Sequence, residues 1–167
     1  MSATALQLDP ITFDNYWAFS QKHFMTAGMS VEKEAVQLAY ETFFGVTLYV
    51  QRVMHDFWAE KLLGHEGDLD LMTDVIERYI QECSPRLREQ MSYITESQKE
   101  LLYAVSHDGQ VKSITSSAFV KRHSLKSPSA VQAAAKKLLE FDLLTKHNGI
   151  YCIADPLLAI WLDRQIK

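Results

Sequence analysis

Apolar residues recur every three or four positions through the first half of the chain, which is the spacing of amphipathic helices. The first predicted helix covers Ile11 to Ala27, with Thr12 as its N-cap and Gly28 as its stop. The remaining predicted helices of this half run from after Ser30 to Gly45, from near Thr47 to Gly64, from Leu71 onward, and from a short start at Ser84-Pro85. The first half is therefore predicted to be a helical bundle.

The second half changes pattern near its end. A capping box, Thr95 to Gln98, predicts a helix that ends at Gly109, and a second short helix is predicted over Ser116 to His123. The stretch from Ser127 then predicts a helix with Pro128 in its first turn, two strands at 143–146 and 150–153 around an Asn-Gly turn, and a closing helix from Pro156. A helix followed at once by a β-hairpin is typical of a winged helix-turn-helix. We therefore expect a mainly α fold with a small β-hairpin wing.

Charge divides the chain in the same way. Residues 1–94 carry 7 Lys+Arg and 14 Asp+Glu, a net of −7, whereas residues 95–167 carry 10 and 7, a net of +3. We therefore predict two domains, a helical subdomain over 1–94 and a winged helix over 95–167. The basic excess is weaker than that of most strong DNA-binding proteins.

Aromatic residues are dense in the first three predicted helices, and we expect most of them to form a core, with some left exposed as a docking patch. They are Tyr16, Trp17, Phe19, Phe24, Phe43, Phe44, Phe57 and Trp58. No apolar run is long enough to span a bilayer, and no secretory signal is visible at the N-terminus. With Cys83 and Cys152 far apart and outside any metal-type pair, we expect buried reduced thiols in a cytoplasmic protein.

The sequence contains no pattern typical of an active site. There is no GxxxxGK[ST] phosphate loop and no GxSxG nucleophile motif. The six histidines form neither HExxH nor a close cluster with cysteine, so no metal site is expected. The chain alone is therefore not expected to be an enzyme.

The candidate binding surface is the helix after the turn together with the wing. In a winged helix this helix lies in the major groove, and the hairpin touches the flank of the duplex. The candidate contact residues are Ser127, Ser129, Gln132, Lys136, Lys137, Lys146 and His147. Ser and Gln suit base edges or phosphates, and Lys suits phosphate, but the helix has no Arg to read guanine. A protein-binding module with the same shape remains an alternative.

Four strings carry a resemblance to a known family: LQLDPITFDNYWAFSQKHF, FFGVTLYVQRV, TESQKELLYAVSHDG and LKSPSAVQAAAKKLLEFDLLTKHNGIYCIADPLLAIWL. Together they cover nearly the whole chain. The chain resembles the C-terminal part of archaeal-type, STAND-like ATPases of the AAA superfamily. In that family a P-loop core is followed by a helical lid and a winged helix.

The resemblance implies that residues 1–94 are the lid of an ATPase whose core, with bound ATP and Mg²⁺, would precede Leu6. It places Gly45, Thr47, Gln51 and Arg52 where the lid turns toward the nucleotide, with Arg52 as the candidate γ-phosphate sensor. The family often has Pro at the position of Thr47. The chain is then either a C-terminal fragment or a protein that has lost its core.

Three functions follow as hypotheses. The first is a relay, in which the nucleotide state of a separate P-loop core moves the lid about Gly45 and repositions the winged helix toward DNA or a regulatory protein. The second is a free-standing winged-helix DNA-binding transcriptional regulator. The third is a protein-interaction adaptor, which predicts an exposed apolar patch over residues 13–58.

Overall fold

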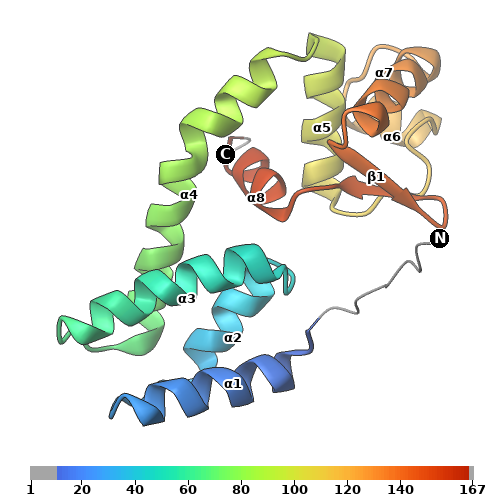
Figure 1. Cartoon of the computed structure of the whole chain (residues 1–167). Coiled ribbons are helices and arrows are strands. Elements are labelled where there is room, and N and C mark those ends of the chain that lie inside the picture. The colour runs from blue at the N-terminus through green and yellow to red at the C-terminus, as the bar shows by residue number, and fades with distance from the viewer. Residues whose placement is uncertain (1–10, 166–167) are drawn as a thin grey trace, which may run out of the picture. The chain divides into compact units, whose positions relative to one another are not determined.

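A computed structural model of the chain describes residues 11–165 (Figure 1). Residues 6–10, the start of the string LQLDPI, lie outside this range. The described chain is mainly helical, with one antiparallel two-stranded hairpin, as predicted. Contacts divide it into two units, one ending at Gln81 and the other beginning at Glu82.

The first unit contains three complete helices and the start of a fourth. They are α1 (Phe13–Thr26), α2 (Lys33–Thr42), α3 (Thr47–Leu62) and the first part of α4 (Asp68–Ser92). Helix α2 contacts both α1 and α3 (Figure 1). Thr12 caps α1 by accepting a hydrogen bond from the Asn15 amide, as predicted.

The aromatic core of this unit forms as expected, with two exceptions. Tyr16, Phe24, Phe43 and Phe57 are buried, and Trp17 and Trp58 are half-buried. Phe19 and Phe44 are exposed. The apolar surface near Phe44 is described with the candidate site below.

A buried ion pair holds three segments of the first unit together. Asp68 is 5% exposed and accepts a hydrogen bond from Lys61 Nζ at 2.6 Å. Its second carboxylate oxygen accepts the backbone N–H of Glu32 at 2.7 Å. Glu32 is the N-cap of α2, Lys61 lies at the end of α3, and Asp68 begins α4. One carboxylate thus satisfies a helix N-terminus and a buried cation at the same time.

The second unit contains the rest of α4 and all later elements. These are α5 (Glu96–Asp108), α6 (Ser117–Arg122), α7 (Pro128–Glu140), β1 (Leu144–His147), β2 (Ile150–Ile153) and α8 (Pro156–Gln165). Helix α5 is central, because it contacts α7, α8 and β2 (Figure 1). The capping box that begins α5 is present, with Thr95 and Gln98 bonding each other's backbone amides.

The wing adds a third short segment to the hairpin. β1 and β2 pair antiparallel, from Leu144 opposite Ile153 to His147 opposite Ile150. Asn148 and Gly149 both have positive φ, as a tight hairpin turn requires. Val111 bridges Tyr151 through two backbone hydrogen bonds of 3.0 and 2.8 Å. The chain after α5 is thereby held against the outer side of the wing.

One predicted element is wrong. Ser84-Pro85 does not open a new helix, because α4 continues through Pro85 to Ser92. Proline costs the helix the hydrogen bond to the carbonyl of Gln81, four residues earlier. The Ser84 hydroxyl serves as an acceptor instead of a cap: the Trp161 indole N–H donates to it at 2.9 Å across the fold, and Arg88, one turn later in α4, donates to it at 3.0 Å. Leu87 and Met91, beyond the proline, are buried, and this packing favours the continued helix.

Cys83 and Cys152 are both free and are half-buried, less buried than expected. None of the described helices has the length and apolar character needed to cross a membrane.

The Asp68 pair generates the first prediction. Asp68→Ala should lower the free energy of unfolding by about 3 kcal/mol, because it leaves the Lys61 ammonium buried and the Glu32 amide without an acceptor. Chemical denaturation monitored by circular dichroism measures the change. Asp70→Ala is the matched control, since it removes an exposed carboxylate from the same helix turn. Equal effects of the two variants would contradict the role assigned to Asp68.

Candidate nucleic-acid interface and lid turn

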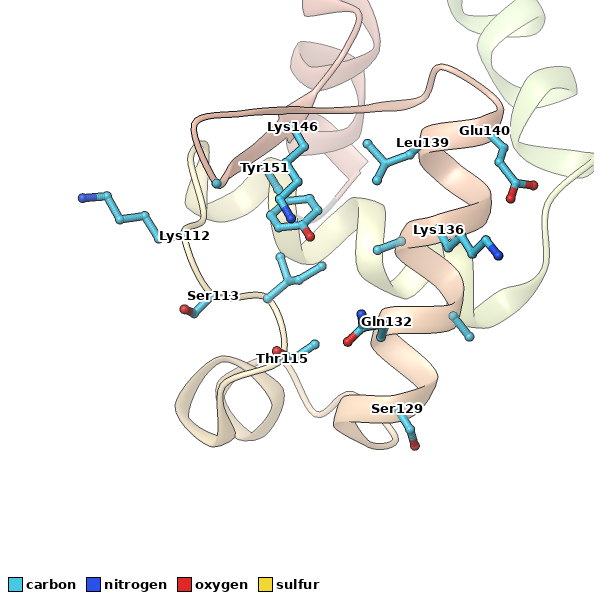
Figure 2. A pocket seen from close by; sticks show the side chains of 14 residues that line it. Lys112, Ser113, Thr115, Ser129, Gln132, Lys136, Leu139, Glu140, Lys146 and Tyr151 are labelled. Carbon is cyan, nitrogen blue, oxygen red and sulfur yellow. The ribbon is translucent and has the colours of Figure 1, made fainter.

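The outer face of α7 borders a groove of about 1010 Å³ in the second unit (Figure 2). Val131, Ala134, Ala135 and Leu138 are buried, so α7 turns its opposite face outward. Three walls form the groove: α7 itself, the wing, and the segment 112–115. The polar residues that line it are Lys112, Ser113, Thr115, Ser129, Gln132, Lys136, Glu140, Lys146 and Tyr151.

The structure brings four of the seven predicted contact residues to this groove. Ser129, Gln132 and Lys136 line it from α7, and Lys146 lines it from β1 (Figure 2). The Lys146 ammonium lies 4.8 Å from the centroid of the Tyr151 ring, so this cation is supported by the aromatic face. The predicted residues Ser127, Lys137 and His147 do not line the groove.

These three residues have other surroundings. Ser127 is the N-cap of α7, where its hydroxyl accepts the Ala130 amide at 3.2 Å. Lys137 donates to Glu140 at 2.7 Å, and this hydrogen bond lowers the pKa of Glu140 from its ordinary value. Glu140 therefore stays anionic and balances the charge of Lys137. His147 is exposed beside the turn of the wing.

The basic character of the groove rests mainly on two lysines. Among residues 11–165, neither Lys136 nor Lys146 has a carboxylate partner within ion-pair distance. Lys112 also lines the groove, although its side chain extends outward (Figure 2). Lysine ammonium groups bind phosphate as point charges, and the serine, threonine and glutamine side chains around them can donate hydrogen bonds to phosphate or base edges. The chemistry of the groove suits an anionic, extended ligand.

Sequence reasoning missed one wall of the groove. It predicted an extended segment over 111–115 but did not assign Lys112, Ser113 or Thr115 to the site. The missing information was the pairing of Val111 with Tyr151, a contact between residues 40 positions apart. The sequence of this short segment, VKSIT, does not alternate between polar and apolar residues, so it gave no local signal of the wall.

The predicted lid site lies between α2 and α3. Phe44 and Gly45 both have positive φ, and the Gly45 amide donates to the Tyr40 carbonyl at 2.8 Å. A Cβ at Gly45 would lie 2.8 Å from the Tyr40 ring. Glycine is thus required here both by the left-handed backbone and by a close approach. Phe44, Val46 and Leu48 expose apolar side chains around the turn.

Arg52 lies one to two turns into α3 and is already paired. Its Nε donates to Asp56 at 3.0 Å, and its guanidinium lies 5.9 Å from the centroid of the Tyr79 ring. Thr47 is half-buried and Gln51 is exposed. A nucleotide phosphate would have to compete with Asp56 for Arg52. These residues form no phosphate cradle by themselves, so they fit ATP only as additions to a core that supplies one.

A second polar cluster joins the end of α5 to the end of α6. Asp108 lies with one carboxylate oxygen 3.3 Å from His107 Nδ1 and 3.2 Å from His123 Nε2, and its other oxygen accepts from Arg122 at 2.5 Å. Burial acts to raise the pKa of Asp108, but the two histidines and Arg122 together hold it below its ordinary value. Sequence reasoning did not find this cluster, because His123 is distant along the chain.

Comparison with known proteins supports the described fold. Residues 86–164 match the family described as "Probable winged helix domain". The chain is similar in fold to a solved Walker-type ATPase of Pyrococcus abyssi, with a TM-score of 0.68 and 16% sequence identity. That similarity covers 92% of this chain and 42% of the ATPase chain, so this chain spans less than half of the length of that ATPase. No curated protein sequence matches the chain.

The turn at Gly45 provides the second prediction. Gly45→Ala should lower the free energy of unfolding by more than the cost of about 1–2 kcal/mol for a left-handed alanine, because its Cβ also meets the Tyr40 ring. Gly28→Ala is the matched control, since Gly28 has a φ of +74° but no atom within 4 Å of the added Cβ. Thermal unfolding of both variants measures the difference. If both substitutions cost the same, the Tyr40 contact does not constrain the turn.

Proposed function

We propose that the chain is the lid and winged-helix portion of a Walker-type ATPase, and that it relays the nucleotide state of a P-loop core to a duplex DNA bound at the α7 groove. The observation that supports the first part is the similarity to the Pyrococcus abyssi ATPase, because it extends over both units and leaves more than half of that ATPase outside the match. At 16% identity this likeness concerns the fold, so the ATPase context belongs to the proposal.

The linkage between the two units suits a relay. They are joined through the continuous helix α4, which crosses the boundary at Gln81 and Glu82. A helix transmits rotation better than a flexible loop does. In this proposal the lid moves as a rigid body. Gly45, which the sequence suggested as the hinge, lies between α2 and α3 in a turn held by Tyr40, so this turn is proposed to carry the contact with the core instead.

The surface around Gly45 suits contact with a core domain. Phe44, just after α2, is 76% exposed, and Leu48, in the first turn of α3, is 70% exposed. Exposed apolar side chains of this size are typical of interaction surfaces when they cluster. Arg52 would reach the nucleotide only by exchanging its partner Asp56 for a phosphate. The core would supply ATP and Mg²⁺ binding, and this chain would supply none of the chemistry.

The α7 groove supports DNA over protein as the partner of the winged helix. Neither Lys136 nor Lys146 has a carboxylate within ion-pair distance in the described chain, although the anionic Glu140 also lines the groove and interacts with Lys136 at longer range. Hydroxyl and amide donors line the groove beside the two lysines. This arrangement suits contacts to a phosphate backbone more than an apolar protein surface. With no arginine on α7 we expect weak sequence preference. A free-standing DNA-binding transcriptional regulator remains the second candidate, supported by the same groove.

The third prediction concerns DNA binding. The chain alone should bind duplex DNA in the range of non-specific affinity, about 10⁻⁴ to 10⁻⁶ M, with a log–log salt slope of about −2 to −3 for two or three phosphate contacts. Fluorescence anisotropy at several salt concentrations measures both quantities. Lys136→Ala and Lys146→Ala should each reduce the slope by about 1.

A control variant and two alternative results distinguish the DNA proposal from the competing functions. Lys22→Ala, on α1, removes an exposed lysine far along the chain from the groove and should leave the slope unchanged. A dissociation constant well below about 10⁻⁶ M with strong sequence preference would favour the regulator. No detectable binding would favour the protein-interaction adaptor and contradict the DNA part of the proposal.

The fourth prediction concerns ATP. The chain alone should release no phosphate from ATP above the buffer background, because it contains no phosphate loop. A coupled phosphate-release assay with Mg²⁺ measures this. Sustained turnover that copurifies with the chain, and that is altered by Arg52→Ala, would overturn the relay proposal.

A further inference from the structure

We propose that His107, Asp108 and His123 form a binding site for a divalent transition metal of the zinc class, which would tie the end of α5 to the end of α6. One ligand atom from each residue lies within 4.8 Å of the other two. The residues come from two helix ends that are separated by the segment carrying Val111. The site is distinct from the α7 groove, because none of the three residues lines that groove.

The spacing of the ligand atoms agrees with tetrahedral coordination. Metal–nitrogen and metal–oxygen bonds of about 2.0–2.1 Å place neighbouring ligand atoms of a tetrahedron about 3.3–3.4 Å apart. The Asp108 oxygen lies 3.3 Å from His107 Nδ1 and 3.2 Å from His123 Nε2. Two edges of the tetrahedron are therefore already present. Only the distance between the two imidazole nitrogens, which lie within 4.8 Å of each other, has to shorten. The His107 side chain is 59% exposed and can move to shorten it.

His123 provides an independent indication of a ligand. Its Nε2 is buried and lies 3.2 Å from the Asp108 oxygen, within ion-pair distance but without the geometry of a hydrogen bond to it or to any other group of the described chain. A buried polar atom left without a partner costs free energy, so it calls for a physical reason. Its ring packs against Phe119, 4.7 Å between centroids, which fixes the direction of the nitrogen. A metal ion bonded to Nε2 would satisfy the atom.

The electrostatic surroundings also favour a cation. His107 and Asp108 are the last residues of α5, and His123 is the C-cap of α6, so two helix C-termini with partial negative charge meet at the cluster. Arg122 opposes a cation, but it bonds the other oxygen of Asp108 and its side chain is 60% exposed to screening solvent. Its hydrogen bond also orients the carboxylate, as outer partners of metal ligands commonly do.

Space for a fourth ligand is present beside the cluster. A hollow of about 250 Å³ is lined by Glu100, Tyr103, Ala104, His107 and His123. It can admit a water molecule to complete four coordination. Two imidazoles and a carboxylate favour zinc-class ions over Mg²⁺ or Ca²⁺, which prefer oxygen ligands. Since α6 packs on α7, a bound metal would stiffen the helix pair that supports the groove.

The fifth prediction tests the site with the metal itself. Isothermal titration calorimetry with Zn²⁺ should give a stoichiometry near one, and Zn²⁺ should raise the melting temperature in a way that EDTA reverses. His123→Gln and His107→Gln should each weaken Zn²⁺ affinity by about tenfold or more. His107 is exposed, so its substitution should leave the fold intact; circular dichroism checks this.

Two controls distinguish this site from zinc binding elsewhere on the chain. His55→Gln removes an exposed histidine in α3 and should leave Zn²⁺ affinity unchanged. The His107→Gln variant keeps both cysteines, so Zn²⁺ affinity that is equal in this variant and in the unmodified chain would assign binding to another place and overturn the proposal. Absence of any heat or thermal shift with Zn²⁺ and Co²⁺ would also overturn it. Neither result affects the DNA proposal, because that proposal is tested by the salt dependence of DNA affinity in the Lys136 and Lys146 variants.

Discussion

The second unit depends on the burial of one face of α7 against α5. Val131, Ala134, Ala135 and Leu138 of α7 are all buried, as are Leu101, Leu102 and Val105 of α5. Because a helix buries one face, this packing fixes which residues of α7 point outward. Helix α5 also contacts α8, and the Ser106 hydroxyl donates a hydrogen bond to the Ala159 carbonyl at 2.9 Å. The groove, the wing and the cluster at the end of α5 are all placed by this one helix.

The groove carries little positive charge, and its side chains limit which features of a DNA duplex it can recognise. It presents lysines, hydroxyl groups, one glutamine and the anionic Glu140 beside apolar side chains such as Leu139, with no arginine among the residues that line it. Such a surface can hold a phosphate backbone in register but has few groups that distinguish base pairs. Selectivity would then have to come from outside this surface, either from the shape of the DNA or from other parts of a larger assembly. The proposed relay from nucleotide state to DNA requires phosphate binding of this kind more than recognition of a base sequence.

Local signals predicted most of the elements, because they are encoded within a few residues. The caps at Thr12 and Thr95, the turn at Asn148-Gly149 and the start of α7 at Pro128 are all of this kind. Three features could not be predicted in this way. The continuation of α4 through Pro85 is favoured by the burial of Leu87 and Met91 beyond it, with the Trp161 indole bonding Ser84 across 77 positions. The wall at 112–115 depends on Val111 pairing with Tyr151, and the polar cluster depends on Asp108 meeting His123. Each is a tertiary contact with no local signature.

The central claim is that the α7 groove is the working surface of the winged helix. Two-dimensional ¹H–¹⁵N NMR of the labelled chain, titrated with a short duplex DNA, tests it most directly. The account predicts chemical-shift changes confined to residues 112–115, the outward face of α7 around Gln132 and Lys136, and the wing from Lys146 to Tyr151. Shift changes centred instead on α1 to α3, or spread evenly over both units, would contradict it.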